Sequence, residues 1–423
     1  MKVRYIALLM LLFVAVGSVL PNGLSLNSIG PKGFGMGGAF VGLANDYSAI
    51  YWNPAGLTQM QKNFVGVFAT DVIPMGTYKL YMPLPSPYPA IDIDTKTKTN
   101  HYIAPNLMGY YHCQLAEGLI FGLGVYVPAG IGAEWDGEDL KMLSGNTPVE
   151  WMSKIGVVNI SPVAAYKFSD QFSVGVAFNI FYAMFDLKRP GGGGYQYEES
   201  SSGMGYGVTV GALVKANEMF SFGASFRTKT TVTMSGEAEN PAMALYTAPA
   251  TSDFDREVSW PMWIAGGIAF HPMPEFVITA DVQFSQWSES EDEFTTEFKD
   301  AKWVAALTPN DNNKFILKWK DATQIRFGLG YSVDESLDLR AGFYIDPAPA
   351  PDETYNFLFP SISYNAITIG GGYKMSDFVF DLGVEYLMGK DREIDPIANP
   401  DAMPGTHGMN IFAFSFGIGY EFE

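Results

Sequence analysis

The chain has 423 residues, of which 48% are hydrophobic and only 17% are charged, so it lacks the surface charge of an ordinary cytosolic enzyme. Its formal net charge of -19 argues against nucleic-acid binding, which requires a basic surface. The single cysteine, Cys113, excludes an internal disulfide. We expect no metal site and no cofactor, because the four histidines show neither HxH nor HxxxH spacing.

The first 20 residues are typical of a secretory signal peptide. Lys2 and Arg4 precede an apolar run from Tyr5 to Val16, which is too short to cross a membrane as a helix. We therefore expect residues 1–20 to be removed on export. Beyond them no run of 18 apolar residues occurs, so helical membrane spans are not expected.

The segment GFGMGGAFVGLANDYSAIYWNPAGL, residues 33–57, fits neither a helix nor a strand pattern. A phosphate-binding loop is disfavoured, because no strand precedes the segment and no GK[ST] follows it. Glycine favours close backbone packing inside a crowded enclosure. Pro54 fixes its own φ and pushes Asn53 towards extended geometry, so we expect a turn there. The closely spaced glycines are Gly35, Gly37 and Gly38.

From residue 63 onward, apolar residues alternate with small or polar ones, as in a β-strand with one apolar face. Each candidate strand has roughly the 9 to 11 residues that a tilted membrane strand requires. Short connections such as SDQ, DES and MSD alternate with long ones, as in outer-membrane barrels. The fourteen candidates begin near Asn63, Ala104, Leu119, Ile155, Phe172, Gly203, Phe220, Trp263, Phe276, Ala322, Leu337, Asn365, Phe378 and Asn410.

This pattern predicts an all-β fold, a 14-stranded antiparallel transmembrane barrel over residues 61–423. An even strand count lets the sheet close without an unpaired edge in the hydrocarbon. The alternative is a secreted β-sandwich or propeller, but sandwich strands are usually shorter and their connections do not alternate in length. We therefore expect a multi-pass protein in the outer membrane of a Gram-negative-type bacterium.

Residues 33–57 resemble the amino-terminal hatch of FadL-type outer-membrane transporters, and Asn53-Pro54-Ala55 is the most specific element. The resemblance covers nearly the whole chain after the signal peptide. It implies that residues 21–60 form a hatch, or plug, inside the lumen. Further similar segments are APNLMGYY at 104–111, GLGVYVPAGIGAEWDG at 122–137, SWPMWIAGGIAF at 259–270, KDATQIRFGLGY at 320–331 and RAGFYIDPAPAP at 340–351.

The resemblance also implies a route: capture at outer loops, a pocket in the lumen, and a sideways exit where the third strand kinks. In this sequence the third strand runs into Val127-Pro128-Ala129-Gly130. Pro128 cannot donate to a ladder and Gly130 relaxes the backbone, so we expect pairing to fail there; the alternative is that the strand simply ends. Exposing an acyl chain of ~16 carbons to water costs roughly 12 kcal/mol of free energy, which favours an apolar conduit into the bilayer over a water-filled pore.

Basic residues facing the lumen could bind a fatty-acid carboxylate. The resemblance implies this role, since related transporters use basic lumen residues in this way, and it makes Arg326 and Arg340 the candidates. Lys320, near a strand start, is a third candidate. The favoured alternative is that these charges pair with nearby acids and with the hatch. The residues whose phase predicts an inward direction are Arg227, Arg326, Arg340, Asp281, Asp338, Asp381 and Glu385.

The predicted capture surfaces are the loops at 188–202 and 232–260, where Met243, Leu245 and Tyr246 supply apolar groups. The alternative is that these side chains pack only against neighbouring loops. One departure from the family is Glu423, since barrels of this kind commonly end on the aromatic residue itself.

We predict a passive importer of hydrophobic small molecules, most of all long-chain fatty acids. The alternatives are an importer of neutral aromatic hydrocarbons and a structural or adhesive barrel. An enzyme is not expected, because neither a GxSxG elbow nor a recognisable Ser and His pair occurs. The expected partners are the transported molecule, outer-membrane lipid and lipopolysaccharide, with no nucleic acid, and the protein is expected to be a monomer.

Overall fold

The computed structural model describes residue 23 and residues 25–423, apart from 291, 400 and 401. The predicted signal peptide, residues 1–20, lies outside the described residues. Within the described part of the chain, no helix is long and apolar enough to cross a membrane.

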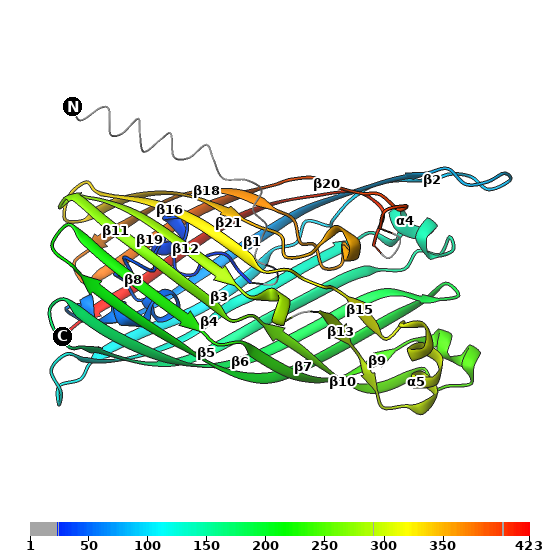
Figure 1. Ribbon diagram of the computed structural model, residues 1–423, viewed down its shortest axis with the longest axis horizontal. Helices are drawn as coiled ribbons and strands as arrows, with labels where there is room; N and C mark the ends of the chain where they lie inside the picture. The colour runs from blue at the N-terminus through cyan, green and yellow to red at the C-terminus, as the bar shows by residue number, and fades with distance from the viewer. Residues whose placement is uncertain (1–22, 24, 291, 400–401) are drawn as a thin grey trace.

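Fourteen antiparallel strands close into a barrel (Figure 1), which confirms the predicted strand count and fold class. The barrel closes where β1 pairs with β21, from Asn63 opposite Phe422 to Lys79 opposite Thr406. The wall strands are β1 (Asn63–Met82), β3 (Tyr102–His112), β4 (Leu119–Trp135), β5 (Trp151–Lys167), β6 (Phe172–Gly192), β7 (Tyr195–Lys215), β8 (Phe220–Arg227), β11 (Trp263–Met273), β12 (Phe276–Ser285), β16 (Ala322–Ser332), β17 (Leu337–Asp346), β18 (Tyr364–Met375), β19 (Phe378–Gly389) and β21 (Gly405–Phe422).

Some wall strands continue beyond a break. β2 (Ile91–Lys96) precedes β3 and also pairs with β1, while β9 (Thr230–Glu239) follows β8, and β10 (Thr251–Trp260) precedes β11. The breaks at 228–229 and 261–262 lie on adjacent strands, since β8 pairs with β11 and β9 pairs with β10. Pro261 explains one break, because proline cannot donate to a ladder.

Most predicted strand starts coincide with the structure, but the predicted lengths are wrong for the longest strands. β6 and β7 have 21 residues each, and the predicted loop at 188–202 is the tip of their hairpin. The predicted loop at 232–260 is largely β9 and β10. Alternation continues in these tips, but outward residues such as Lys188 and Glu198 are charged, and a polar exterior looks like a loop in sequence.

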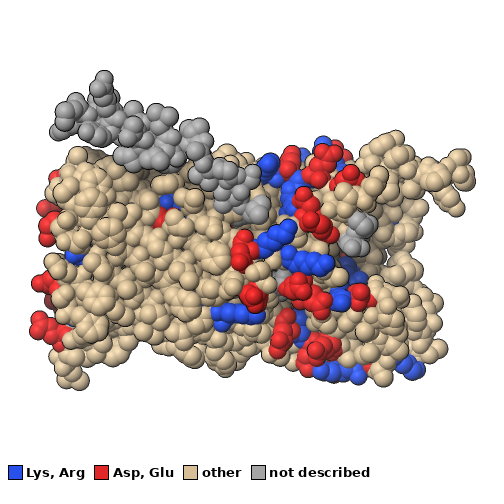
Figure 2. Space-filling view, viewed as in Figure 1, with Lys and Arg blue, Asp and Glu red and all other residues tan. Residues whose placement is uncertain are grey.

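The outward face of the wall is apolar over a band between the two ends of the barrel. On β21, Phe414 and Phe416 are exposed, whereas Ala413 and Ser415 are buried towards the lumen. On the face seen in Figure 2, charged side chains form a belt across the half of the wall that bears the long connections, and a largely uncharged stretch lies beside it. The apolar band is the part suited to a lipid bilayer.

Residues 25–59, which we call the N-terminal segment, lie inside one end of the barrel (Figure 1). Its α2 packs against β18 and β19, and its η2 packs against β5, β6 and β7. Gly42 lies so close to the wall that an added Cβ would sit 2.6 Å from the backbone of Gly267. Its short helices are α2 (Pro31–Gly35), α3 (Ala49–Trp52) and η2 (Pro54–Gln59).

The opposite end is filled by the connection 347–363, which we call the inner loop. Phe357, Leu358, Phe359 and Ile362 are all at most 3% exposed, and Phe357 packs against Trp135 and Trp151. The remaining elements at this end are α4 (Gly137–Leu140), η3 (Lys141–Ser144), η4 (Pro241–Tyr246), η5 (Trp287–Glu289), β13 (Glu293–Thr295), β14 (Glu297–Phe298), α5 (Ala301–Leu307), η6 (Thr308–Asn310), β15 (Lys314–Ile316), η7 (Asp352–Thr354) and β20 (Arg392–Ile394).

Candidate functional site

A cavity of about 640 Å³ lies between the N-terminal segment and the inner loop. Its walls include Leu26 and Phe34 of the segment and Ile362 at the end of the loop. It is lined both by lumen-facing side chains and by Ile103 and Met184, which are 67% and 43% exposed on the outside of the barrel. The cavity therefore passes through the wall.

The passage lies at a seam between β3 and β4, formed by residues 102–106 and 127–134. Pairing of the two strands ends at Leu107 opposite Val125, although β4 remains paired with β5 as far as Trp135. At the start of the seam the Oδ1 atom of Asn106 accepts a hydrogen bond from the Val127 amide at 2.8 Å. The tight packing of Gly132 against the Tyr102 ring narrows the seam further along.

The predicted exit residues, Val127-Pro128-Ala129-Gly130, lie at this seam. The β4–β5 register shifts between Tyr126 and Ala129, so β4 carries an extra residue there. The inward phase consequently switches from even positions, as at Tyr126, to odd positions, as at Ala129 and Ala133. A role for these residues in lateral exit stays a prediction.

The N-terminal segment pairs with the free edge of β4 at the same place. The Leu26 amide donates to the Pro128 carbonyl at 3.0 Å, and Ser25 forms an antiparallel bridge with Ala129. The segment therefore uses a backbone acceptor that β3 leaves free, next to the passage through the wall.

The predicted hatch motif fixes the other end of the segment to the wall. Asn53 donates from Nδ2 to the carbonyls of Val41 and Ala212 at 2.9 and 3.0 Å, and its Oδ1 accepts from the Ala55 amide at 3.2 Å. Pro54 follows as the first residue of η2.

The glycines of the motif permit equally close contacts. A Cβ on Gly38, whose φ is +66°, would lie 2.2 Å from Nη1 of Arg326, and one on Gly35 would lie 3.0 Å from the backbone of Gly370. Gly37 also has a positive φ, +65°, which glycine adopts without strain. These contacts account for the glycine spacing without a phosphate.

The three predicted carboxylate ligands are not brought together. Arg340 forms a buried ion pair with Asp381 and a second contact with Asp338 at 3.5 Å, as the pairing alternative expected. Arg326 donates to the Gly37 carbonyl at 2.9 Å and to Gln324 at 2.6 Å, so the N-terminal segment occupies it. Lys320 is exposed on a connection at the barrel mouth.

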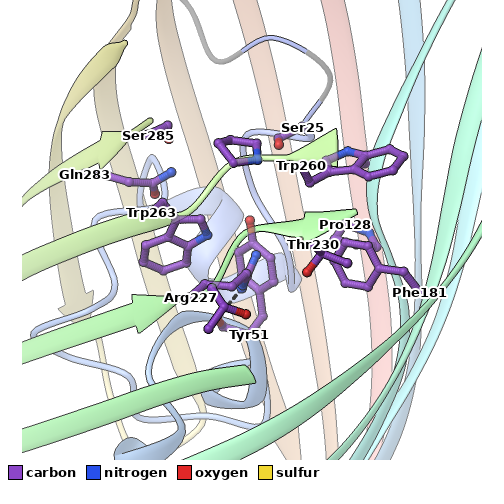
Figure 3. Close-up of a pocket in the computed structure, with 13 residues that line it drawn as sticks. Ser25, Tyr51, Pro128, Phe181, Arg227, Thr230, Trp260, Trp263, Gln283 and Ser285 are labelled. Atoms are coloured by element: carbon purple, nitrogen blue, oxygen red, sulfur yellow. Dashed lines mark hydrogen bonds between the residues drawn. The ribbon is translucent and has the colours of Figure 1, made fainter. Parts of the chain in front are cut away.

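Of the predicted inward-facing charges, Arg227 has the surroundings best suited to a ligand (Figure 3). It is 8% exposed, donates to the Tyr51 carbonyl at 3.0 Å and to Thr209 at 3.2 Å, and lies over the rings of Tyr51 and Trp263. Among the described residues no carboxylate lies within salt-bridge distance of it. An aromatic cage with one unneutralised cation suits an apolar molecule bearing an anionic group.

The pocket beside Arg227 has a volume of only about 20 Å³, and it reaches the seam because Pro128 and Ala129 line it together with Phe181 and Trp260. Sequence reasoning predicted that Arg227 faces inward but did not select it as a ligand. The available signal was the proline in SWPMWIAGG, which interrupts the neighbouring strand and leaves room at this level of the wall.

The predicted capture residues divide between core and surface. Leu245 and Tyr246 are 73% and 57% exposed, but Met243 is 1% exposed, so the expectation of an exposed Met243 is wrong. Asn240 accepts a hydrogen bond from the Ala242 amide at 3.0 Å and starts η4, which turns Met243 into the core. Capture by Leu245 and Tyr246 stays a prediction.

A family model described as "Outer membrane protein transport protein (OMPP1/FadL/TodX)" matches residues 12–422. The chain is 23% identical over 398 residues to an outer membrane protein of Neisseria meningitidis, NMB0088, and the match covers 83% of this chain and 80% of that one. It is 22% identical over 312 residues to the long-chain fatty acid transport protein of Salmonella typhi, covering 65% and 68% of the two chains.

Two solved structures share the fold. A FadL homologue of Pseudomonas aeruginosa has a TM-score of 0.77 at 16% identity, covering 95% of this chain and 100% of that one. The toluene transporter TodX of P. putida has a TM-score of 0.70 at 16% identity, covering 94% and 98%.

Proposed function

We propose that this chain, which belongs to the outer membrane protein transport protein family (OMPP1/FadL/TodX), takes up long-chain fatty acids passively and releases them sideways into the membrane. The chain is a multi-pass barrel of the outer membrane, and its family transports hydrophobic compounds. The observation that carries the proposal is the cavity that passes through the wall at the seam.

The cavity has the size and character expected for an acyl chain. Its volume of about 640 Å³ falls within the range of about 300 to 1,000 Å³ typical of small-molecule sites. Val157 and Met409 on its lumen side and Ile103 on its outer side offer continuous apolar contact. An acyl chain of ~16 carbons avoids a penalty of roughly 12 kcal/mol if it never enters water.

The N-terminal segment acts as a hatch in this proposal. Its contacts at Ser25 and Leu26 hold the free edge of β4 beside the passage, whereas Asn53 anchors the segment at its far end. Release of the first contact while the second persists would widen the route from the lumen to the seam. One backbone hydrogen bond contributes only about 1 kcal/mol, so binding of a substrate could offset its loss.

Arg227 favours a substrate with a carboxylate. A buried guanidinium is stabilised by an anionic partner, and two rings on its apolar side would contact the first methylenes of the chain. The second candidate substrate is a neutral aromatic hydrocarbon, which the rings of Phe181, Trp260 and Trp263 favour by stacking.

Uptake of radiolabelled oleate and toluene by bacteria that lack their own transporter distinguishes these substrates. Expression of the chain should raise oleate uptake at least fivefold over cells with an empty vector, with a smaller effect on toluene. A rise for toluene alone would assign the aromatic substrate, and no rise for either compound would contradict transport. The proposed monomer and the contact with lipopolysaccharide stay predictions.

A further inference from the structure

Asp71 is an acidic residue on the membrane-facing side of the wall. β1 alternates so that Val67 and Met75 are exposed on the outside, and Asp71 shares their phase. Its partners in the ladder are Ile103 on β3 and Phe414 on β21. Both neighbours are apolar and exposed, so Asp71 belongs to the lipid-facing surface.

The position of Asp71 along β1 places it within the apolar band. It lies midway between Asn63, where β1 begins, and Lys79, whose exposed ion pair with Asp94 belongs to the charged end of the wall. An ionisable side chain at membrane depth is unfavourable and usually has a functional partner. Asp71 is nevertheless only 9% exposed, because another side chain covers it.

That side chain is His101, in the break between β2 and β3. Its Nδ1 lies 2.6 Å from Oδ2 of Asp71, which leaves Nε2 for another partner. The His101 side chain is 56% exposed, and it lines the cavity together with Tyr102 and Ile103. The second oxygen of Asp71, Oδ1, is buried and has no hydrogen-bond partner among the residues that the structure describes. The pair thus presents the second imidazole nitrogen, Nε2, at the outer mouth of the seam.

A fatty acid that leaves through the seam must bring its carboxylate past this point into hydrocarbon. The charged form is strongly disfavoured there, whereas the neutral acid is accepted far more readily. A proton donor at the mouth of the exit would remove the charge at the step where it is most costly. An imidazole held in place by a carboxylate is a group suited to donating this proton.

We propose that His101, positioned by Asp71, transfers a proton to the substrate carboxylate as it leaves the seam. The Nε2–H bond of the imidazolium breaks and an O–H bond forms on the substrate, which leaves a neutral imidazole and a neutral carboxylic acid. The neutral imidazole is then protonated again by a hydronium ion from the aqueous phase, which becomes water. The inference rests on the proposed transport of fatty acids.

We assign the proton transfer to the pair of His101 and Asp71, because the other charged groups near His101 are bound elsewhere or lie on the far side of β4. On its own segment Lys98 is bound to Glu134 of β4 at 2.7 Å, and Asn100 donates to the other oxygen of Glu134 at 2.9 Å. Lys154 of β5 lines the same cavity on the far side of β4. β21 places the apolar side chain of Phe414 next to Asp71, and Asp71 itself is the charged group that β1 contributes.

The test compares a carboxylate with an alcohol of the same chain. Uptake of oleate and of oleyl alcohol is measured between pH 6 and pH 8.5 in cells that express the full chain, His101→Gln or Asp71→Asn. His271→Gln, near the other end of the barrel on β11, is the matched control, and folding is verified by the heat-dependent migration of the barrel in gels.

We expect His101→Gln to lower oleate uptake at least fivefold while oleyl alcohol uptake stays within twofold. The ratio of oleate to alcohol uptake should fall with rising pH in the parent and should fall less steeply in His101→Gln, where only the ionisation of the substrate itself remains. Asp71→Asn should also lower oleate uptake, because it removes the carboxylate that positions the imidazole. Equal loss of both substrates, or an unchanged ratio, would overturn the proton-transfer role alone. Absence of oleate uptake in the parent would overturn the proposed function with it.

Discussion

Replacing Arg227 by glutamine tests the carboxylate site in the lumen. Glutamine retains a donor near the position of the arginine Nε, which donates to Thr209 at 3.2 Å, but it removes the buried positive charge. Hydrogen bonds to charged groups contribute about 1.5 to 3 kcal/mol. The loss of one such bond to a bound carboxylate corresponds to a decrease in affinity of about 10- to 150-fold.

Binding of oleate to the detergent-solubilised barrel, followed by calorimetry, measures this change. Toluene should bind Arg227→Gln about as well as the parent, since it has no anionic group. Lys320→Gln is the matched control, because Lys320 is exposed at the mouth and should not affect oleate affinity. Equal oleate affinity in Arg227→Gln and the parent would refute the assignment, and a parallel loss for toluene would indicate a damaged pocket instead.

Three further predictions concern the closure of the two ends. Replacing Gly42 by valine should destabilise the N-terminal segment by a few kcal/mol, because a Cβ would lie 2.6 Å from the backbone of Gly267; proteolysis of the folded barrel should then cleave the segment faster, and an unchanged rate would contradict the packing. Arg392 donates to the carbonyls of Ala350 and Ser361 at 3.0 and 2.8 Å, so Arg392→Ala should loosen the inner loop and raise entry of small hydrophilic dyes, an effect absent if the loop is held elsewhere. His407 lies level with the exposed Lys79 on the neighbouring strand, and burial lowers the pKa of His407 to about 4. The neutral ring therefore stabilises the closed inner loop fully above about pH 6.5. This contribution, about 3 kcal/mol, is lost as the pH falls towards 4. The protection factors of amides in the inner loop against hydrogen exchange should therefore fall over that range, and protection factors independent of pH would contradict the argument.

The wall could be predicted from sequence because its pattern is local. Strands such as β6 and β19 begin at the predicted residues Phe172 and Phe378, since a period of two with one apolar face is imposed directly by lipid on one side. The parts of β6 and β7 that form the tip of their hairpin were not predicted, for the same reason. Water replaces lipid there, so the outward residues become polar although the backbone remains a strand.

Pairing of the lumen charges could be expected from sequence, but the partner of each charge could not, because the partners lie on strands that are distant in sequence. Arg340 on β17 reaches Asp381 on β19 across β18, where Gly372 leaves the space: a Cβ there would lie 2.3 Å from Nη2 of Arg340. The inward phase of both charges followed from alternation, but the intervening glycine decides whether they meet.

The seam could be predicted from sequence only in part. Pro128 signalled that β4 loses an amide donor, and the structure has an irregular register between Tyr126 and Ala129. The partner of the free Pro128 carbonyl, Leu26, is about a hundred residues away in the N-terminal segment, and no local pattern indicates it. Arg227 was similarly identified as lumen-facing, yet its aromatic cage assembles from two separate elements, Tyr51 on α3 and Trp263 on β11.

A disulfide between the N-terminal segment and β4 tests most directly whether substrate leaves through the seam. Ser25 and Ala129 form a bridge flanked by the Leu26 to Pro128 hydrogen bond, which is the non-hydrogen-bonded arrangement whose Cα atoms lie about 4.5 Å apart, close enough for a disulfide. The measurement is oleate uptake by cells that express Ser25→Cys with Ala129→Cys in a Cys113→Ser background, before and after reduction. Oxidised cells should show the uptake of an empty vector and should recover on reduction, whereas the single Ser25→Cys variant should be insensitive. Equal uptake by the cross-linked and reduced barrels would contradict lateral exit past a movable N-terminal segment.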